Sequence, residues 1–197
     1  MELTSFNPAT GKEIGKVPVT DPSEIQKKVD SLRKRIPTVD LETRLSWVRS
    51  GAERIRSQVE ELARLMTEEQ GKPLKESMGE VANSAVRLDY FCDTAPKALA
   101  PIEADLGNAR SVTRFQPIGV IGAIKPWNFP VTIPIWTIGP ALLAGNSILF
   151  KPSERTPLLG EAIAKLFPDA PMETVHGADE VGKAIVDSDV DMISFVG

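Results

Sequence analysis

Cysteine and histidine are scarce in this 197-residue chain, which holds one of each, Cys92 and His176. One cysteine excludes an internal disulfide framework and a cysteine-based zinc site, and it fits a reducing compartment. One histidine excludes metal sites built from several imidazoles, and it leaves His176 as the only imidazole base for Ser-His-Asp or Cys-His catalysis. Cys92 falls on the core-facing side of a predicted helix and His176 at the end of a predicted strand, so we expect neither to do chemistry.

A large excess of one charge and a targeting segment are also missing. The chain has 23 Lys+Arg against 27 Asp+Glu, a formal net charge of -4. This balance argues against nucleic acid or an anionic membrane as the main partner. The first residues have neither the basic nor the apolar stretch of a secretory signal, so the expected location is the cytoplasm.

One uncharged stretch, between Lys125 and Lys151, is long enough to suggest a membrane span. A spanning helix needs about 20 apolar residues, and residues 131–150 would suffice by length alone. The prolines and turn-forming residues that interrupt the stretch are Pro126, Pro130, Pro134, Pro140, Gly139, Gly145, Asn128 and Asn146. A buried strand–helix–strand unit explains the same residues better, so no membrane partner is expected.

The N-terminal residues predict a hairpin followed by a helix. Two short extended pieces flank a turn at residues 9–12. Asp21 then stands as a helix cap before a proline, and an apolar stripe follows as far as Ile36. The helix is expected to end at Pro37, because proline cannot continue it.

Two further amphipathic stripes predict two longer helices. One runs from Leu41 to Met66 as a single helix and stops at the Gly-Lys-Pro sequence of residues 71–73. The other covers residues 74–95 and includes Cys92. Amphipathic helices of this kind are also compatible with a non-enzymatic helical interaction module, which stays open as an alternative.

The second half of the chain predicts an α/β fold. Residues 110–116 alternate polar and apolar, as a half-exposed strand does. From residue 117 onward the expected strands are 118–124, 147–150, 172–176 and 192–196, and the expected helices are 131–144, 157–167 (capped by Thr156) and 179–186. Such alternation implies a Rossmann-like parallel sheet with helices on both faces, here preceded by the hairpin and the long amphipathic helices.

Chemistry is expected beyond the carboxyl ends of the predicted strands, where open α/β sheets bind ligands. Three loops lie there, at residues 125–130, 151–154 and 177–182. The first strand–helix turn lacks the Gly-x-Gly-x-x-Gly fingerprint of dinucleotide sites, so motif reading alone indicates a nucleotide only weakly.

Most residues in these loops allow two interpretations. Lys151 and Glu154 stand where dinucleotide folds carry the acid that binds a ribose, but they would equally form a solvated ion pair. Residues 177–182 open a helix whose N–H groups suit a pyrophosphate, or they form an ordinary glycine turn. Asn128, in a loop bounded by prolines, carries the amide donors that an oxyanion needs.

Several motifs, in order along the chain, resemble the aldehyde dehydrogenase superfamily. They are residues 6–11 (FNPATG), 69–73 (EQGKP), 115–120 (FQPIGV), 126–130 (PWNFP), 139–142 (GPAL) with 145–146 (GN), 151–154 (KPSE) with 156–157 (TP), and 189–197 (DVDMISFVG). The resemblance covers essentially the whole chain. It implies residues 1–100 as the N-terminal arm and helices, 101–116 as a strand of the oligomerisation element, and 117–197 as the NAD(P)-binding core.

The resemblance also implies roles for individual residues. Asn128 would stabilise the oxyanion of a thiohemiacetal, and Lys151 and Glu154 would bind the adenosine ribose of the cofactor. The residues expected at the cofactor are Ile124, Lys125, Pro126, Trp127, Asn128, Lys151, Ser153, Glu154, Gly177, Gly182, Phe195 and Gly197. No metal ligand is expected, and the oligomerisation element implies a homo-oligomer.

In that family, the catalytic cysteine, the general-base glutamate and the catalytic domain lie beyond the motif at which this chain ends. Cys92 lies far upstream of the position of the family's nucleophile. We therefore expect the N-terminal, cofactor-binding portion of a longer enzyme that oxidises an aldehyde to a carboxylic acid. The 197-residue chain alone is expected to be inactive and prone to associate.

Glu154 favours NAD as the cofactor. A carboxylate accepts a hydrogen bond from the 2′-hydroxyl of NAD but repels the 2′-phosphate of NADP. Lys151 would soften that repulsion, so NADP stays possible. The other hypotheses are the helical interaction module and an unrelated nucleotide-binding domain in which Lys151 and Glu154 serve a different purpose.

Overall fold

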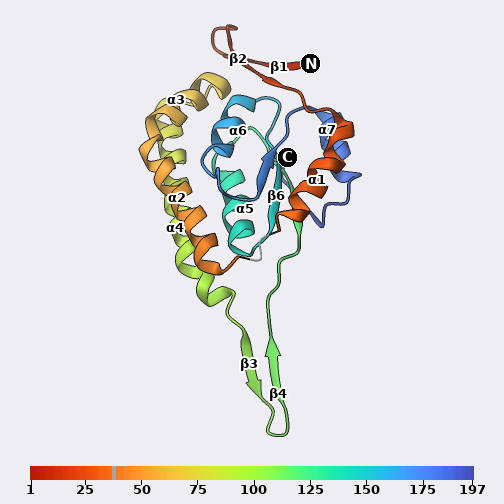
Figure 1. Ribbon diagram of the computed structural model, residues 1–197. Coiled ribbons are helices and arrows are strands. Elements are labelled where there is room, and N and C mark those ends of the chain that lie inside the picture. Colours follow the sequence, from red (N-terminus) through yellow and green to blue (C-terminus); the bar gives the residue numbers. More distant parts are fainter. Residues whose placement is uncertain (37–38) are drawn as a thin grey trace.

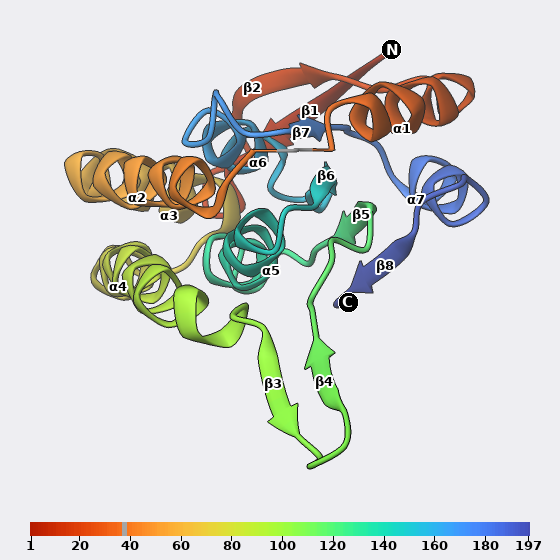
Figure 2. The ribbon, with the colours of Figure 1, turned by 60° about the horizontal axis from the view of Figure 1, so that its bottom comes forward.

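The computed structural model describes residues 1–36 and 39–197, and at its centre is a four-stranded parallel sheet (Figures 1 and 2). The strands are β5 (Val120–Ile124), β6 (Ser147–Lys151), β7 (Met172–Thr174) and β8 (Met192–Phe195), in the spatial order β7-β6-β5-β8. The chain moves outward from β5 to β7 and then returns to place β8 on the free side of β5. This return creates a switch point between β5 and its neighbours, where open α/β sheets bind ligands.

Helices cover both faces of this sheet, as the sequence predicts. They are α1 (Ile25–Lys34), α2 (Leu41–Ser57), α3 (Val59–Gln70), α4 (Leu74–Ala98), α5 (Thr132–Leu143), α6 (Pro157–Ala164) and α7 (Asp179–Val186). Figure 2 shows α1 and α7 on one side of the strands and α2 to α6 on the other. The α/β class with flanking helices is therefore confirmed.

Alternate side chains of the central strands serve two separate cores. Ile121 and Phe150 pack into the larger core with α2 to α6, while Val120 and Leu149 pack against α1 and α7. All four are at most 5% exposed. A strand with buried side chains on both faces has a continuous apolar run, which is why β5 and β6 could be recognised from sequence.

The N-terminal hairpin forms as predicted, with β1 (Glu2–Phe6) antiparallel to β2 (Glu13–Pro18). Asp21 caps the following segment by accepting a hydrogen bond from the backbone N–H of Ser23 at 2.9 Å. The segment begins with a short 3₁₀ turn, η1 (Pro22–Glu24), before α1 starts. The predicted helix stop at Pro37 lies outside the described residues.

The prediction of one helix from Leu41 to Met66 is wrong, because the chain breaks at Gln58. That residue has φ -119° and ψ 18°, outside the helical region, and α3 starts immediately after it. The apolar stripe continues across the break, so periodicity could not reveal it. The predicted stop after α3 is correct: Gly71 adopts φ +83°, the left-handed conformation that ends many helices.

The structure has a projecting two-stranded hairpin at residues 102–113, where the sequence predicts one half-exposed strand at 110–116 and the resemblance implies a strand within 101–116. Strand β3 (Ile102–Asp105) pairs antiparallel with β4 (Arg110–Thr113), and every residue of both strands is exposed. Figure 1 shows this hairpin extending well away from the sheet and helices.

The start of α6 differs from the prediction as well. Thr156 makes no capping hydrogen bond through its side chain. The buried carboxylate of Glu69 from α3 takes that place and accepts hydrogen bonds from the N–H groups of Leu158 and Leu159, both at 2.8 Å. A distant acid thus satisfies the donors of this helix end.

Within the described residues, no helix has the length and apolar character needed to cross a membrane. The uncharged stretch between Lys125 and Lys151 instead holds α5 and most of β6, as the strand–helix–strand interpretation predicts.

Candidate functional site

A pocket of about 630 Å³ opens at the carboxyl ends of β5, β6 and β8. Its lining comprises Ile124, Lys125, Pro126, Trp127, Asn128, Lys151, Ser153, Glu154, Ala178, Asp179, Gly182, Lys183, Val186, Phe195, Val196 and Gly197. The three loops singled out from the sequence therefore meet in one place, together with the end of β8. They meet at the switch point because the parallel strands all present their carboxyl ends to the same edge.

Among the residues expected at the cofactor, only Gly177 does not line this pocket. Gly177 has φ +154°, and a Cβ added there would lie 2.3 Å from Cγ2 of Val181. It allows the chain to turn closely over α7, so its part in the site is conformational.

Sequence reasoning missed three lining residues, Lys183 and Val186 on α7 and Val196 just after β8, and it named Ala178 and Asp179 only as part of the loop at residues 177–182. Asp179, Lys183 and Val186 are spaced by four and three residues, so they share one face of the helix. That spacing, taken with Gly182, was the signal that could have identified them.

Lys151 and Glu154 do not behave as a solvated ion pair. Lys151 is only 5% exposed, and its Nζ donates to the carbonyl of Pro152 at 3.4 Å. Burial lowers the pKa of Lys151, an effect that the nearby carboxylates of Glu154 and Asp179 partly oppose. Glu154 accepts a hydrogen bond from Oγ of Ser153 at 3.4 Å and keeps the rest of its carboxylate for a ligand in the pocket.

Lys125 ties β5 to β8 at the switch point. Its Nζ donates to the carbonyl of Ser194 at 2.9 Å and to Oγ of Ser194 at 2.7 Å. The side chain is 3% exposed, and burial lowers the pKa of the ammonium from 10.5 to about 8. Oγ of Ser194 also lies 3.3 Å from Oγ1 of Thr137 on α5, so a small polar cluster sits beneath the pocket.

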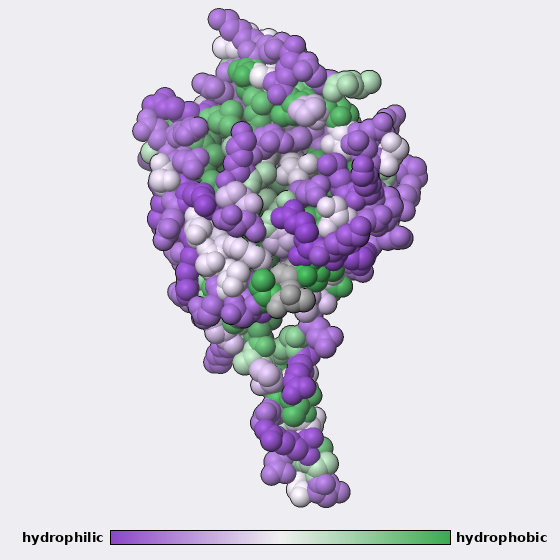
Figure 3. Space-filling view, in the orientation of Figure 1, coloured by the Kyte–Doolittle hydropathy of each residue, from purple (hydrophilic) through white to green (hydrophobic). Residues whose placement is uncertain are grey.

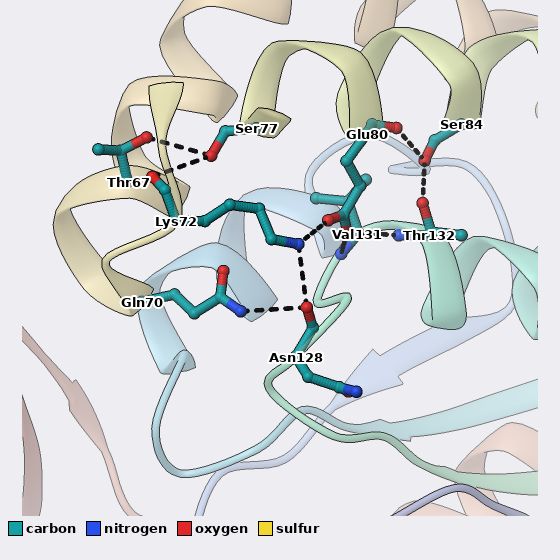
Figure 4. A network of polar contacts seen from close by, with 9 residues as sticks. All are labelled: Thr67, Gln70, Lys72, Ser77, Glu80, Ser84, Asn128, Val131 and Thr132. Atoms are coloured by element: carbon teal, nitrogen blue, oxygen red, sulfur yellow. Dashed lines mark hydrogen bonds and ion pairs between the residues drawn. The ribbon is translucent and has the colours of Figure 1, made fainter. Parts of the chain in front are cut away.

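The loop that carries Asn128 is held from behind by the turn between α3 and α4 (Figure 4). The main-chain carbonyl of Asn128 accepts hydrogen bonds from Nε2 of Gln70 and Nζ of Lys72, both at 3.0 Å. In Figure 4 the side-chain amide of Asn128 points away from these two donors. The neighbouring Trp127 is 44% exposed, and the guanidinium of Arg155 lies 5.5 Å from its ring centre.

Cys92 and His176 are both buried and line none of this pocket. Cys92, on the buried face of α4, is 1% exposed in the larger core, and burial raises the pKa of its thiol to about 11. His176 is 3% exposed, and its Nε2 lies 2.6 Å from Oε1 of Glu161, a contact that lowers the pKa of that carboxyl. The thiol therefore has the properties of a core residue and not of a nucleophile.

Comparison with known proteins identifies a family that matches this chain. The model of the aldehyde dehydrogenase family matches residues 1–197. Malonate-semialdehyde dehydrogenase 1 of Geobacillus kaustophilus is 32% identical over 201 residues, which are 97% of this chain and 41% of that protein. The chain therefore spans about two fifths of the length of such relatives.

Solved structures show the same relationship. A point mutant of betaine aldehyde dehydrogenase from Staphylococcus aureus, in complex with NAD+, matches with a TM-score of 0.91 and 30% identity over 99% of this chain and 42% of that one. A glyceraldehyde-3-phosphate dehydrogenase from Methanocaldococcus jannaschii, complexed with NADP, matches with a TM-score of 0.92 and 28% identity over 98% of this chain and 45% of that one. The chain belongs to the aldehyde dehydrogenase family, whose members bind NAD+ or NADP.

The residues at the switch point fit a dinucleotide. Glu154 offers a ribose the acceptor it needs just beyond β6, and the first turn of α7 brings its main-chain N–H groups to the pocket at Asp179. Gly182 lies over the side chain of Lys151, and a Cβ there would make only an ordinary contact with Cε of Lys151, at 3.8 Å. The carboxylate of Asp179 opposes a pyrophosphate, and the buried ammonium of Lys151 offsets part of that charge.

Proposed function

We propose that this chain is the cofactor-binding portion of an enzyme that oxidises an aldehyde to a carboxylic acid with NAD+. The observation that supports the proposal most directly is the convergence of Glu154, Lys151 and Asn128 on one pocket at the switch point of the sheet. Residues 1–100 would serve as arm and helices, 101–116 as oligomerisation element and 117–197 as the cofactor-binding core.

Each part of the pocket has a distinct task in this proposal. Glu154 and Lys151 bind the ribose hydroxyls, and the N–H groups at the start of α7 contact the pyrophosphate. Asn128 directs its amide at the aldehyde and stabilises the oxyanion that forms when the carbonyl is attacked. A bound nicotinamide would supply the hydride acceptor, and Phe195 and Gly197, at the end of β8, would hold that end of the cofactor.

The nucleophile is not Cys92 in this proposal, because its thiol is buried in the helical core and its pKa is raised to about 11. None of the residues that line the pocket carries a thiol. The 197-residue chain on its own should therefore produce no aldehyde-dependent NADH.

Tryptophan fluorescence during titration with NAD+ tests cofactor binding. Trp127 lines the pocket and is 44% exposed, so a bound dinucleotide should quench it. Trp127→Phe should remove the signal while calorimetry still detects the same binding heat. An absence of NAD+ binding by both methods would overturn the proposal and favour a helical interaction module.

The preference for NAD+ over NADP+ rests on Glu154. Its carboxylate lies in the pocket close to the buried ammonium of Lys151. Glu154→Gln keeps an acceptor for the 2′-hydroxyl and removes the charge that repels a 2′-phosphate, so the ratio of the two affinities should move toward NADP+. Tighter binding of NADP+ than NAD+ by the unaltered chain would contradict the preference.

We also propose that the β3–β4 hairpin mediates association. Ile102, Leu106 and Val112 are large apolar side chains that are exposed on it. Figure 3 shows apolar and polar residues side by side on this projection, which has no covering element on the face in view. Light scattering should find assemblies larger than a monomer, and Val112→Lys should reduce them; a monodisperse monomer at high concentration would refute this proposal.

A further inference from the structure

A buried ion pair lies behind the Asn128 loop, outside the cofactor pocket. Nζ of Lys72 pairs with Oε2 of Glu80, and their side chains are 12% and 3% exposed. Lys72 lies in the turn just before α4 and Glu80 lies in α4. Neither side chain lines the cofactor pocket. Buried ion pairs of this kind add little net stability compared with apolar residues of similar volume, so stability alone is a weak explanation for their presence.

Apart from the bond within the pair, the side chains of Lys72 and Glu80 form hydrogen bonds with the main chain of residues 128–132. Lys72 donates to the carbonyl of Asn128 at 3.0 Å, and its ammonium lies 4.2 Å from the centre of the Phe129 ring. Oε1 of Glu80 accepts from the N–H groups of Val131 at 3.1 Å and Thr132 at 3.2 Å. The pair thus binds the loop both at Asn128 and at the beginning of α5.

The carboxylate of Glu80 stabilises the start of α5 electrostatically. The first N–H groups of a helix lack partners within the helix and carry partial positive charge, so a carboxylate stabilises them. Glu80 meets that need with one oxygen and holds Lys72 with the other. Ser84, one turn further along α4, lies 3.2 Å from Oγ1 of Thr132 and adds a second link between the two helices.

The contacts at Asn128 hold its main chain in place. Gln70 joins Lys72 in donating to the carbonyl oxygen, so both acceptor positions of that oxygen are occupied from the side of α3 and α4. The side-chain amide points away from Gln70 and Lys72 (Figure 4). An oxyanion donor is effective only when it is oriented before the charge develops.

We propose that Lys72 and Glu80 are positioning residues, which hold the main chain of Asn128 and the start of α5 so that the Asn128 amide is oriented in advance. The catalytic meaning of this orientation rests on the proposed function. The orientation itself is a property of the chain, so it is measured without substrate or cofactor.

Backbone ¹⁵N relaxation of the 197-residue chain provides the test. In the unaltered chain the amides of Asn128 and Phe129 should be as rigid as the sheet, with order parameters of about 0.85, and in Lys72→Met they should fall to about 0.6 or lower. Lys72→Arg keeps the charge and the donors and should restore most of the order. Lys75→Met removes an exposed lysine three residues further along the chain, in the first turn of α4, and should change nothing.

Lys72→Met leaves the carboxylate of Glu80 buried without its partner, which destabilises the fold, so a second variant is needed. The double variant Lys72→Met with Glu80→Gln removes both charges and keeps an oxygen for the N–H groups of Val131 and Thr132. It should fold and still lose order at Asn128 and Phe129, while the amides of β5 and β6 stay rigid.

Two results would overturn the proposal. One is unchanged order at Asn128 and Phe129 in the double variant. The other is a loss of order spread evenly over α4, α5 and the sheet, which is what a merely structural role would produce. A wild-type chain that fails to bind NAD+ would instead defeat the proposed function and leave the positioning result standing, so the two failures are distinguishable.

Discussion

Gly122 lies in the central strand β5, at the closest approach between the sheet and α7. A Cβ added at this position would lie 2.8 Å from Cγ2 of Ile185 and 3.2 Å from Cδ1 of Ile193. Cγ2 of an isoleucine is attached directly to its Cβ and cannot swing aside without a change of χ1, which is stiff in a β-branched residue on a helix. Gly122→Ala should therefore push the backbone of α7 away from the sheet.

The energetic consequence of Gly122→Ala follows from two opposing effects. Overpacking of a closed core costs about 1–3 kcal/mol. The loss of glycine flexibility in the unfolded chain returns about 0.4–1 kcal/mol, because Gly122 does not have a positive φ. With the middle of each range the net destabilisation is about 1.3 kcal/mol, which for a protein of this size lowers the melting temperature by about 3–5 °C.

Gly79→Ala is the matched control, since no atom lies within 4 Å of a Cβ added there. Gly79 is in the middle of α4, where alanine is more favourable than glycine by about 0.5–1 kcal/mol. Scanning calorimetry should therefore find the two melting temperatures displaced in opposite directions.

Gly122→Ala should also weaken cofactor binding. Helix α7 brings Asp179, Gly182 and Lys183 to the pocket, so its displacement separates them from the strand ends. Gly122→Ala should raise the dissociation constant for NAD+, and Gly79→Ala should leave it unchanged. A melting temperature for Gly122→Ala equal to or above that of the unaltered chain would refute the packing argument.

Three further predictions concern single buried residues. Burial lowers the pKa of Lys125 from 10.5 to about 8, so between these pH values the unfolded chain binds a proton that the folded chain has released. Stability from this group therefore rises with pH across that window, and urea unfolding of Lys125→Met should lack the rise. The thiol of Cys92, with its pKa raised to about 11, should react with a disulfide reagent only as fast as the chain unfolds; rapid labelling of the native chain would contradict this. Phe150 is fully buried, and Phe150→Ala should lower the free energy of unfolding by about 3–5 kcal/mol in urea titrations, whereas a loss below about 1 kcal/mol would show that the core can close around the gap.

The parts of the fold that were predictable are those whose physics is local. β5 and β6 are buried on both faces, so they appear as apolar runs, and the helices between strands follow from the prolines and glycines near their ends. Once a parallel sheet is inferred, the loops after its strands must lie along one edge. That single geometric rule is why Glu154 and Asn128, which are 26 positions apart in the sequence, could be expected in one site.

The parts that were missed depend on contacts between distant segments. The break at Gln58 leaves the apolar stripe intact, so only the packing of α2 and α3 against their neighbours reveals it. The cap on α6 comes from Glu69, which is 89 and 90 positions before the N–H groups it accepts. A charged residue in an amphipathic helix is normally solvated, and the sequence contains no mark that distinguishes the few that turn inward.

The Asn128 loop combines both kinds of information, and this explains why its chemistry was easier to predict than its orientation. One end of the loop follows β5, where the sheet determines its location. The other end is held by Lys72 and Glu80, whose charges are eight residues apart and become buried only because α5 packs across α4. The carbonyl of Asn128 needs donors and the start of α5 needs an acceptor. Lys72 and Glu80, lying side by side, supply both. The sequence names the amide that could stabilise an oxyanion, whereas the direction of that amide depends, in our proposal, on Lys72 in the turn before α4 and on Glu80 in α4.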